Sequence, residues 1–296
     1  VISGTPSDRN VEDAREEAAG LRDYVNAPDD NYDYSLHSTI KGEGYAAHVL
    51  SMTSQTWHPD KTTPPVWRHW VTIIVPTKVT KDEAMMVLSD GFSTAEHPIA
   101  EVPVIFLAMA LTTKSVVVLV EGFPLGEVGF HDDPFLAPGI KPERFAVATF
   151  ARFLDTEEAT WPIVCPLVKT VVRAMDTVQR YAAEDLGLET VPQGFMLTGE
   201  AAGWATWLTG AVDERVVAIA PIHFDLVDIN QQIEYQVGFR GELSPLLSLF
   251  SEMDVMPALD TPEGKKLLSI IDPYAYRAAL DVPKLVLLPS SQTPYT

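Results

Sequence analysis

The stretch GFMLTGEAAGW, residues 194–204, joins a short apolar run to a turn of small residues and an apolar helical segment. The run Gly194–Leu197 predicts a buried strand, and Ala201–Val212 predicts a short buried helix. Small residues between them permit a sharp backbone turn, the geometry of a nucleophile elbow, whose apex side chain lies above the sheet beside helix amides. The apex residue here is Glu200, whereas such an elbow needs a serine, cysteine or aspartate to attack.

Similar apolar runs recur on both sides of this turn. Two β-rich segments, Tyr45–Thr53 and His69–Pro76, predict a pair of strands. Shorter continuous runs are typical of strands that helices cover on both faces, and they occupy Ala84–Leu88, Ser115–Val120 and Val216–Ala220. The run Lys284–Leu288 predicts the last strand. Helical patterns lie between them at Pro142–Leu154 and Pro166–Leu186. The alternation predicts an α/β fold with a mostly parallel sheet and helices on both faces.

The chain divides into three parts by composition. Residues 1–35 are polar, acidic and rich in turn-forming residues, which predicts a surface arm. Residues 36–227 and 284–296 carry the strands and predict the α/β core. Residues 228–283 contain acidic helical pieces broken by Pro and Gly, which predicts a helical cap inserted before the last strand. A closing strand and helix would ordinarily follow that strand, so we expect the C-terminal part of the fold to be missing.

Charge and composition exclude several classes of protein. The 296 residues contain 21 Lys and Arg against 41 Asp and Glu, a net charge of −20, and 46% are hydrophobic. A chain with this hydrophobic content is not a disordered acidic tail. A surface with this negative charge repels nucleic acid and anionic lipid. The single cysteine, Cys165, allows neither an internal disulfide nor a cysteine-based metal cluster. The most apolar stretch, Pro103–Val120, has Lys114 in its middle, which argues against a membrane span.

Histidines offer few candidates for chemistry. The turn His131-Asp132-Asp133 matches no zinc spacing, so neither a metal nor another cofactor is predicted. His69 lies between tryptophans, where we expect a packed side chain. His223 follows the strand Val216–Ala220 at the carboxyl edge of the sheet, where ligands of such folds bind, and is a pocket candidate.

The remaining pocket candidates come from two turns. Asp90 and Gly91 follow the strand Ala84–Leu88, where an intact enzyme would supply an oxyanion donor. Glu200 and Ala201 belong to the elbow itself. As it stands, the loop after Ala84–Leu88 is more simply interpreted as a turn.

Long matches in order along the chain identify a family. They comprise Asp23-Tyr24-Val25-Asn26, Thr53-Ser54-Gln55-Thr56-Trp57, Trp67-Arg68-His69-Trp70, Trp161-Pro162, Pro166-Leu167-Val168-Lys169, Val172-Arg173-Ala174-Met175-Asp176, Gly203-Trp204-Ala205-Thr206-Trp207-Leu208-Thr209, Arg215-Val216-Val217-Ala218-Ile219-Ala220-Pro221, Ile271-Asp272-Pro273-Tyr274 and Pro283-Lys284-Leu285. The sequence resembles the PhoPQ-activated pathogenicity-related family, which includes autocrine proliferation repressor proteins.

This resemblance implies an α/β-hydrolase-like fold in proteins that are usually exported. In the family's usual pattern the elbow holds a serine followed by Lys-Arg-Gly-Trp. Counting back from Gly203 places that serine at Glu200 and replaces the Lys-Arg pair by Ala201 and Ala202. The acid expected after the Pro-Lys-Leu strand falls at Gln292, and the family's histidine belongs to a segment beyond Thr296. The resemblance therefore implies a triad substituted at every position, which removes the covalent mechanism.

Two hypotheses about function follow. The first is a catalytically inactive hydrolase-like protein, a pseudoenzyme acting as a binding, signalling or structural accessory subunit with protein partners. The second is an active hydrolase of esterase or peptidase type that uses Glu200 or is completed by a missing C-terminal segment. By family tendency we expect a secreted or extracytoplasmic protein, with an organellar or assembly-bound location left open.

Overall fold

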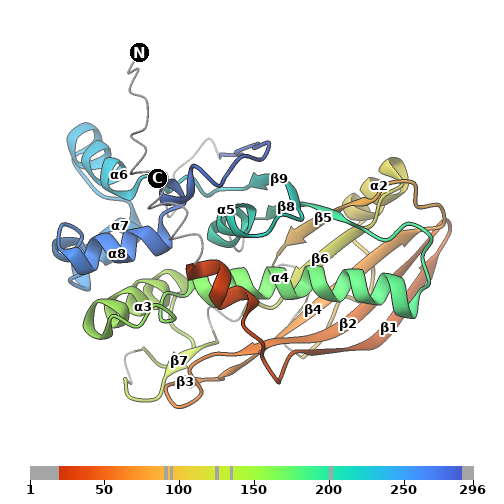
Figure 1. The fold of residues 1–296 in the computed structure, drawn as a ribbon, viewed down its shortest axis with the longest axis horizontal. Coiled ribbons are helices and arrows are strands. Elements are labelled where there is room, and N and C mark those ends of the chain that lie inside the picture. The colour runs from red at the N-terminus through yellow and green to blue at the C-terminus, as the bar shows by residue number, and fades with distance from the viewer. Residues whose placement is uncertain are drawn as a thin grey trace.

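A seven-stranded sheet forms the centre of the computed structural model, which describes residues 20–89, 93, 96–123, 127–133, 136–199 and 203–288 (Figure 1). In spatial order the strands are β1 (Asp33–Gly42), β2 (Tyr45–Thr56), β4 (Val66–Pro76), β6 (Val117–Glu121), β5 (Glu83–Leu88), β8 (Gly194–Gly199) and β9 (Val216–Pro221). A separate pair, β3 (Thr62–Thr63) and β7 (Gly129–Phe130), lies beside one end of this sheet.

Strand direction changes at β6. The strands β6, β5, β8 and β9 run parallel, whereas β1, β2 and β4 extend the sheet with antiparallel pairings. Every residue of β6 is buried, as expected for a parallel strand covered on both faces. The expected α/β fold, with a mostly parallel sheet, is confirmed, and the strands found at residues 45–56 and 66–76 pair as expected.

Helices cover both faces of the sheet unequally. One face is covered by α2 (Val104–Thr113), which contributes Phe106 and Ala110 to the smaller of two hydrophobic clusters. The other face carries α3 (Pro142–Thr156), α4 (Val164–Arg180) and α5 (Gly203–Val212), which build the larger cluster. A π-helical turn, η3 (Tyr181–Asp185), prolongs α4 close to the end expected for that helix.

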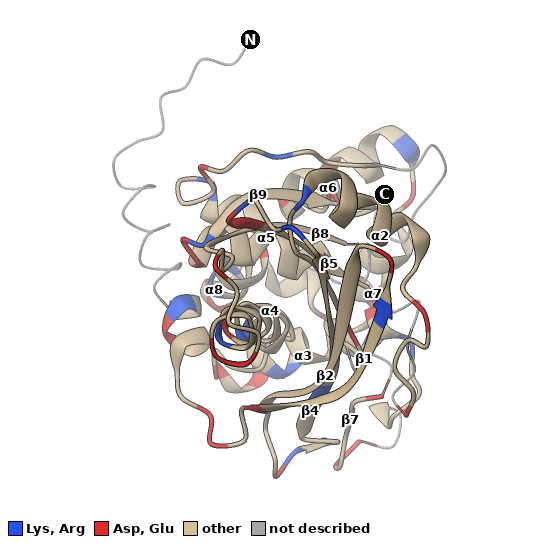
Figure 2. Cartoon of the chain, turned by 90° about the vertical axis from the view of Figure 1, so that its right-hand side faces the viewer, with Lys and Arg blue, Asp and Glu red and all other residues tan. Residues whose placement is uncertain are grey.

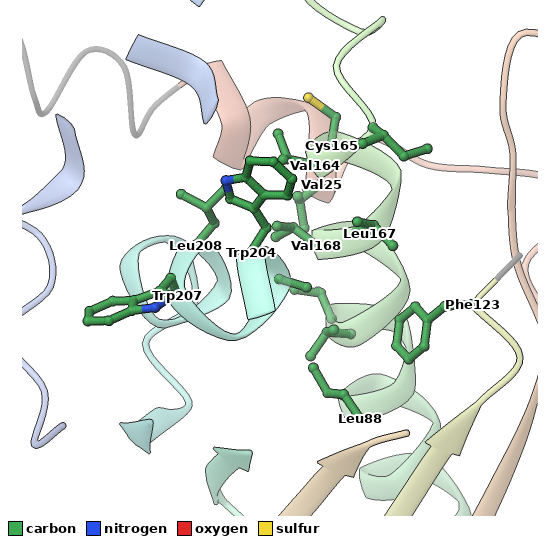
Figure 3. Packing of buried hydrophobic residues seen from close by; sticks show 14 of the residues in the cluster. Val25, Leu88, Phe123, Val164, Cys165, Leu167, Val168, Trp204, Trp207 and Leu208 are labelled. Atoms are coloured by element: carbon green, nitrogen blue, oxygen red, sulfur yellow. The ribbon is translucent and has the colours of Figure 1, made fainter. Parts of the chain in front are cut away.

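The contact between α4 and α5 contains the two tryptophans of the elbow helix. Trp204 and Trp207 are each 7% exposed, and Figure 3 shows Trp204 beside Val164 and Val168 of α4. The Trp204 ring also packs against Phe224 beyond β9, with centroids 5.0 Å apart. Both tryptophans are core residues, as the apolar helix predicts.

Three further tryptophans meet where β2 and β4 approach the start of α4. Trp57 contacts Trp67 and Trp161 edge-on, with centroid distances of 5.8 and 5.9 Å. Trp67 is fully buried, and Trp57 and Trp161 are 2% and 3% exposed. The His58 ring stacks on the Trp161 ring, with centroids 3.8 Å apart. Aromatic edge-to-face contacts of this kind fix the geometry of the core beyond simple burial.

Helical pieces follow β9, as the sequence predicts for residues 228–283. They are α6 (Ile229–Tyr235), the π-helical turn η4 (Gln236–Arg240), α7 (Pro245–Glu252), the 3₁₀ turn η5 (Met256–Ala258), α8 (Pro262–Ile271) and the 3₁₀ turn η6 (Pro273–Tyr276). Each of α6, α7 and α8 has a side-chain cap, from Asp228, Ser244 and Thr261 respectively. The pieces α7 and α8 pack against α3.

One buried carboxylate joins the two ends of this helical region. Asp272 accepts hydrogen bonds from the backbone N–H groups of Asp228 (3.0 Å), Ile229 (2.8 Å) and Tyr274 (2.9 Å). Burial raises the pKa of Asp272, an effect that these backbone hydrogen bonds partly offset. The side chain thereby ties the start of α6 to the start of η6.

Most of residues 20–35, the described part of the segment expected to be a surface arm, are exposed, but two apolar residues dock the segment on the core. Residues 20–26 form a helix whose Leu21 and Val25 are 4% and 2% exposed. Lys169 of α4 donates a hydrogen bond to Ala27 O at 2.8 Å, and β1 begins at Asp33. Polar residues dominate the composition here, but two apolar residues four apart suffice to dock one turn of a helix.

The last expected strand, Lys284–Leu288, is only partly formed. Two isolated parallel bridges join Lys284 to Ile219 and Leu287 to Ile222 of the β9 region. The apolar residues 285–288 are between 38% and 60% exposed.

Candidate functional site

The elbow backbone is tightly constrained on both sides of its turn. β8 ends at Gly199, where a Cβ atom would collide with the carbonyl oxygen of Leu88 on the neighbouring β5. α5 begins at Gly203, where a Cβ atom would collide with the side chain of Phe224. Glycine is therefore required at both positions for strand, turn and helix to pack this closely. Glu200 and Ala201, which fall between these two glycines in the sequence, are outside the described residues.

A buried carboxylate holds the loop that follows β5. Glu121 ends β6 and is 1% exposed. Its Oε1 accepts the backbone N–H of Ser93 at 3.0 Å, and its Oε2 accepts the Ser93 hydroxyl at 2.7 Å. Asp90 and Gly91, expected near an oxyanion site, lie outside the described residues. The sequence carried one signal for Glu121, which is an acidic residue at the end of an otherwise apolar run.

The loop after β9 is held by backbone and indole hydrogen bonds. His223 has a left-handed φ of 59°, its side chain is half-buried, and its N–H donates to Leu287 O at 2.8 Å. Trp207 Nε1 donates to Phe224 O at 3.3 Å. His223 thus lies at the carboxyl edge of the parallel strands, as expected, while a role in a pocket stays a prediction.

Asp225, in the same loop, is a second residue that the sequence analysis missed. Its Oδ1 is buried and makes no hydrogen bond within the described part of the chain, and burial raises the pKa of its carboxyl. A buried carboxyl oxygen without a donor is energetically costly. Its place, three residues after Ile222 at the edge of the parallel strands, makes it a candidate for contact with a ligand.

Ser54 and His69 form a serine–histidine hydrogen bond within the core. Ser54 Oγ and His69 Nε2 are 2.8 Å apart, and the residues are 0% and 3% exposed. Burial lowers the pKa of His69 to about 3, an effect only partly offset by the backbone at Gly122. The His69 ring packs between Trp67 and Phe123. Enclosure of both residues identifies a structural pair and confirms His69 as a packed histidine.

The substituted triad cannot be assembled from the described residues. Gln292, expected at the acid position, lies outside them, as does Glu200. Within the described ranges, no three His, Cys, Asp or Glu side chains are grouped as metal ligands, and His131 lies on an exposed turn. Burial raises the pKa of Cys165 to about 12, so its thiol is protonated at neutral pH.

Basic side chains are few, and within the described residues ion pairs involve Arg144, Arg152, Arg173, Arg180, Arg215 and Lys266. Figure 2 shows Asp and Glu distributed over the loops and helices around the sheet. Arg215 contacts Asp176 at 2.8 Å and Asp213 at 2.7 Å, so its charge is neutralised locally. None of the described helices is long and apolar enough to cross a lipid bilayer.

Comparisons with solved structures agree with this architecture. Acetyl xylan esterase from Paenibacillus sp. R4 superimposes with a TM-score of 0.54 at 12% identity, covering 98% of this chain and 90% of that chain. Acetyl xylan esterase 1 from Thermoanaerobacterium sp. superimposes with a TM-score of 0.52 at 11% identity, covering 97% and 92%. At these identities the similarity shows the fold, which is that of the α/β-hydrolases.

Sequence comparison gives a closer relationship. Autocrine proliferation repressor protein A of Dictyostelium discoideum is 33% identical over 267 residues, covering 89% of this chain and 52% of the relative. The chain therefore spans about half the length of the curated relative it matches. The sequence profile of the family described as PhoPQ-activated pathogenicity-related protein matches residues 21–295. On this match the chain belongs to the PhoPQ-activated pathogenicity-related protein family.

Proposed function

We propose that this chain is a catalytically inactive α/β-hydrolase-like protein that acts by binding protein partners, as a signalling or accessory subunit. The observation that carries the proposal is the elbow. Gly199 and Gly203 preserve its tight geometry, while the sequence between them offers Glu200, Ala201 and Ala202 and no hydroxyl or thiol. The scaffold is retained without the nucleophile that acyl transfer requires.

Other features support the same proposal. The buried Ser54–His69 pair cannot reach a substrate, and the thiol of Cys165 is enclosed and protonated. The curated relative is named for autocrine repression of proliferation, and its name mentions no hydrolytic reaction. Signalling of this kind would place the protein outside the cytoplasm, in keeping with the exported family members. A shared fold does not specify function, so the esterase neighbours do not oppose this proposal.

A hydrolysis and labelling experiment tests the absence of chemistry. Purified protein is incubated with p-nitrophenyl acetate and, separately, with a fluorophosphonate probe for active serines. We expect no turnover above buffer and no labelled band, because no described hydroxyl is exposed beside a base at the elbow.

The decisive variant is Glu200→Gln, with Glu189→Gln, at an exposed position, as its matched control. Turnover that is present in the wild type and in the control but lost in Glu200→Gln would establish the alternative, an active hydrolase using this carboxylate. Equal background in all three proteins supports the inactive assignment.

Partner binding is tested in the same preparation. When the purified protein is added to cells that respond to the curated relative, it should bind to their surface. Treating the cells with protease beforehand should abolish that binding, whereas binding that survives proteolysis would contradict a protein partner.

A further inference from the structure

Residues 20–28 form a strap that crosses α4 and reaches α5, and Figure 1 shows this segment in red. Two of its side chains are buried, those of Leu21 and Val25. Both belong to the larger hydrophobic cluster, together with Trp204 of α5 (Figure 3). The helix of residues 20–26 is too short to be stable alone in water, so the strap keeps its shape only while it is docked.

Two cations of α4 hold the strap at one backbone carbonyl. Lys169 Nζ donates to Ala27 O at 2.8 Å, and Arg173 Nη2 donates to the same oxygen at 3.0 Å. Lys169 Nζ also lies 3.5 Å from Tyr24 O and 5.2 Å from the centre of the Tyr24 ring. These carbonyls lie at the C-terminal end of the helix of residues 20–26, where the negative end of the helix dipole favours positive charge. The attachment of the strap to α4 therefore depends on charge as well as on its two apolar side chains.

This attachment has a desolvation cost. Lys169 is 4% exposed, although an ammonium group is strongly hydrated in water. Burial and the neighbouring Arg173 lower the pKa of Lys169, an effect that Asp29 partly offsets. Release of the strap would return water to the ammonium group, which offsets part of the loss of its hydrogen bonds. The net free energy that holds the strap is therefore smaller than its contacts alone would give.

The chain that follows the strap is fixed to β2. Asp29 Oδ2 accepts the backbone N–H of Thr56 at 2.8 Å, and Asp29 Oδ1 accepts that of Asn31 at 3.0 Å. Asn31 Nδ2 in turn donates to Thr56 Oγ1 at 2.7 Å. These three bonds involve neither α4 nor α5. The strap can therefore detach from both helices while the chain stays joined to the sheet at Asp29.

The strap also contacts the end of the elbow helix. Arg22 Nε donates at 3.0 Å to the carbonyl oxygen of Val212, the last residue of α5. The last carbonyl groups of a helix have no donor within it, so this bond caps α5. The helix is short, and its sequence GWATWLTGAV contains two glycines and two threonines, which have low helix propensity. The stability of α5 therefore depends on packing and on this cap.

We propose that residues 20–28 are a detachable strap that locks the elbow helix, so that α5 loosens when the strap leaves α4. The segments of lowest local stability in a protein have few buried apolar contacts and much exposed backbone. The strap has two buried side chains, whereas every residue of β6 is buried. Displacement of the strap would therefore change the elbow helix without unfolding the parallel sheet. The strap thereby gives the fold a regulatory contact remote from the elbow turn.

Amide hydrogen exchange of the full chain, measured by mass spectrometry of its peptic peptides, tests the proposal with Lys169→Met. This substitution removes the charge that holds Ala27 O and keeps an unbranched side chain on α4. We expect exchange at least tenfold faster than in the wild type in peptides from residues 20–28 and from α5, with unchanged exchange in β6. The matched control is Lys265→Met, at an exposed position on α8, which should exchange like the wild type in all three segments.

Three results of this experiment would overturn the proposal. Faster exchange in the strap alone would show that the strap detaches without affecting α5. Unchanged exchange in both segments would show that Lys169 does not hold the strap, and faster exchange that extends equally to β6 would report global unfolding. If Lys169→Met fails to fold, Val25→Ala gives the same test from the strap, because it shortens one of the two apolar anchors.

Coupling between two segments is reciprocal, so a substitution in α5 should also release the strap. We expect Gly203→Ala to accelerate exchange in residues 20–28 more than in β6, whereas Gly238→Ala should leave both unchanged. Faster exchange in α5 without any change in the strap would contradict the lock. The hydrolysis and labelling experiment reports on chemistry at the elbow and not on this coupling, so the two proposals are tested separately.

Discussion

At the scale of single residues, the buried polar groups were the hardest features to foresee. His69, Glu121 and Asp225 all lie within or beside apolar sequence, and nothing in that sequence shows which buried polar group has a partner. His69 could be assigned to the core from its tryptophan neighbours. Glu121 and Asp225 could be understood only from the structure. Glu121 binds a serine in another loop, and Asp225 Oδ1 has no donor among the described residues.

The buried His69 makes a specific contribution to acid sensitivity. Its pKa is about 3 in the folded protein and near 6.5 when unfolded, so the unfolded chain gains a proton first as the pH falls. The stability associated with neutral His69 is therefore complete above pH 6.5 and is lost toward pH 3. When the pH falls from 6.5 to 5, we expect the unfolding free energy of the wild type to fall by about 2 kcal/mol more than that of His69→Gln.

Urea unfolding at the two pH values measures this difference. His131→Gln, on an exposed turn, is the control and should follow the wild type. Parallel pH dependence in all three proteins would show that His69 is not neutral in the folded state.

At the scale of elements, apolar runs predicted the strands well and polar composition misled. The strands β5, β8 and β9 were located within two residues because each contains a continuous apolar run. The edge strand β1 escaped notice because its exposed, mixed sequence DYSLHSTIKG has no apolar run. The elbow itself was predicted from small residues alone, while the turn at residue 200 lies outside the described part.

The strand–turn–helix at the elbow should tolerate no added methyl group. Gly203→Ala would force its Cβ into Phe224, and we expect a loss of about 1–3 kcal/mol in unfolding free energy from overpacking. Gly238→Ala is the control, because a Cβ there has no neighbour within 4 Å. Denaturant unfolding checks the pair, and equal stability of both variants would contradict the tight packing described for α5.

The tie between α6 and η6 should depend on the Asp272 carboxylate. Asp272→Ala leaves the N–H groups of Asp228, Ile229 and Tyr274 without their acceptor, which we expect to cost about 1–3 kcal/mol. Hydrogen exchange should accelerate most at these amides. Asp260→Ala, at an exposed residue in the same region, should leave exchange unchanged, and acceleration spread evenly over the chain would argue against a local tie.

At the scale of the whole molecule, the net charge of −20 is a property that the sequence alone established, and it should weaken the folded state at low ionic strength. The 21 Lys and Arg residues offset only about half of the charge of the 41 Asp and Glu residues. We expect the thermal unfolding midpoint to rise between low salt and physiological ionic strength, because screening reduces the mutual repulsion of carboxylates. Sodium and potassium chloride should act equally, and a midpoint that falls with either salt would contradict this account.

The placement of the tryptophans gives the protein a built-in optical probe. Trp57, Trp67 and Trp161 sit at one end of the core, and Trp204 and Trp207 sit on the elbow helix, all nearly inaccessible to solvent. Their combined emission will be blue-shifted in the native state and move to longer wavelength when water reaches the indoles. Because one group reports on the β2–β4 end and the other on α5, replacing either group together with the sixth tryptophan, the half-buried Trp70, by phenylalanine would let fluorescence follow the loosening of each region separately.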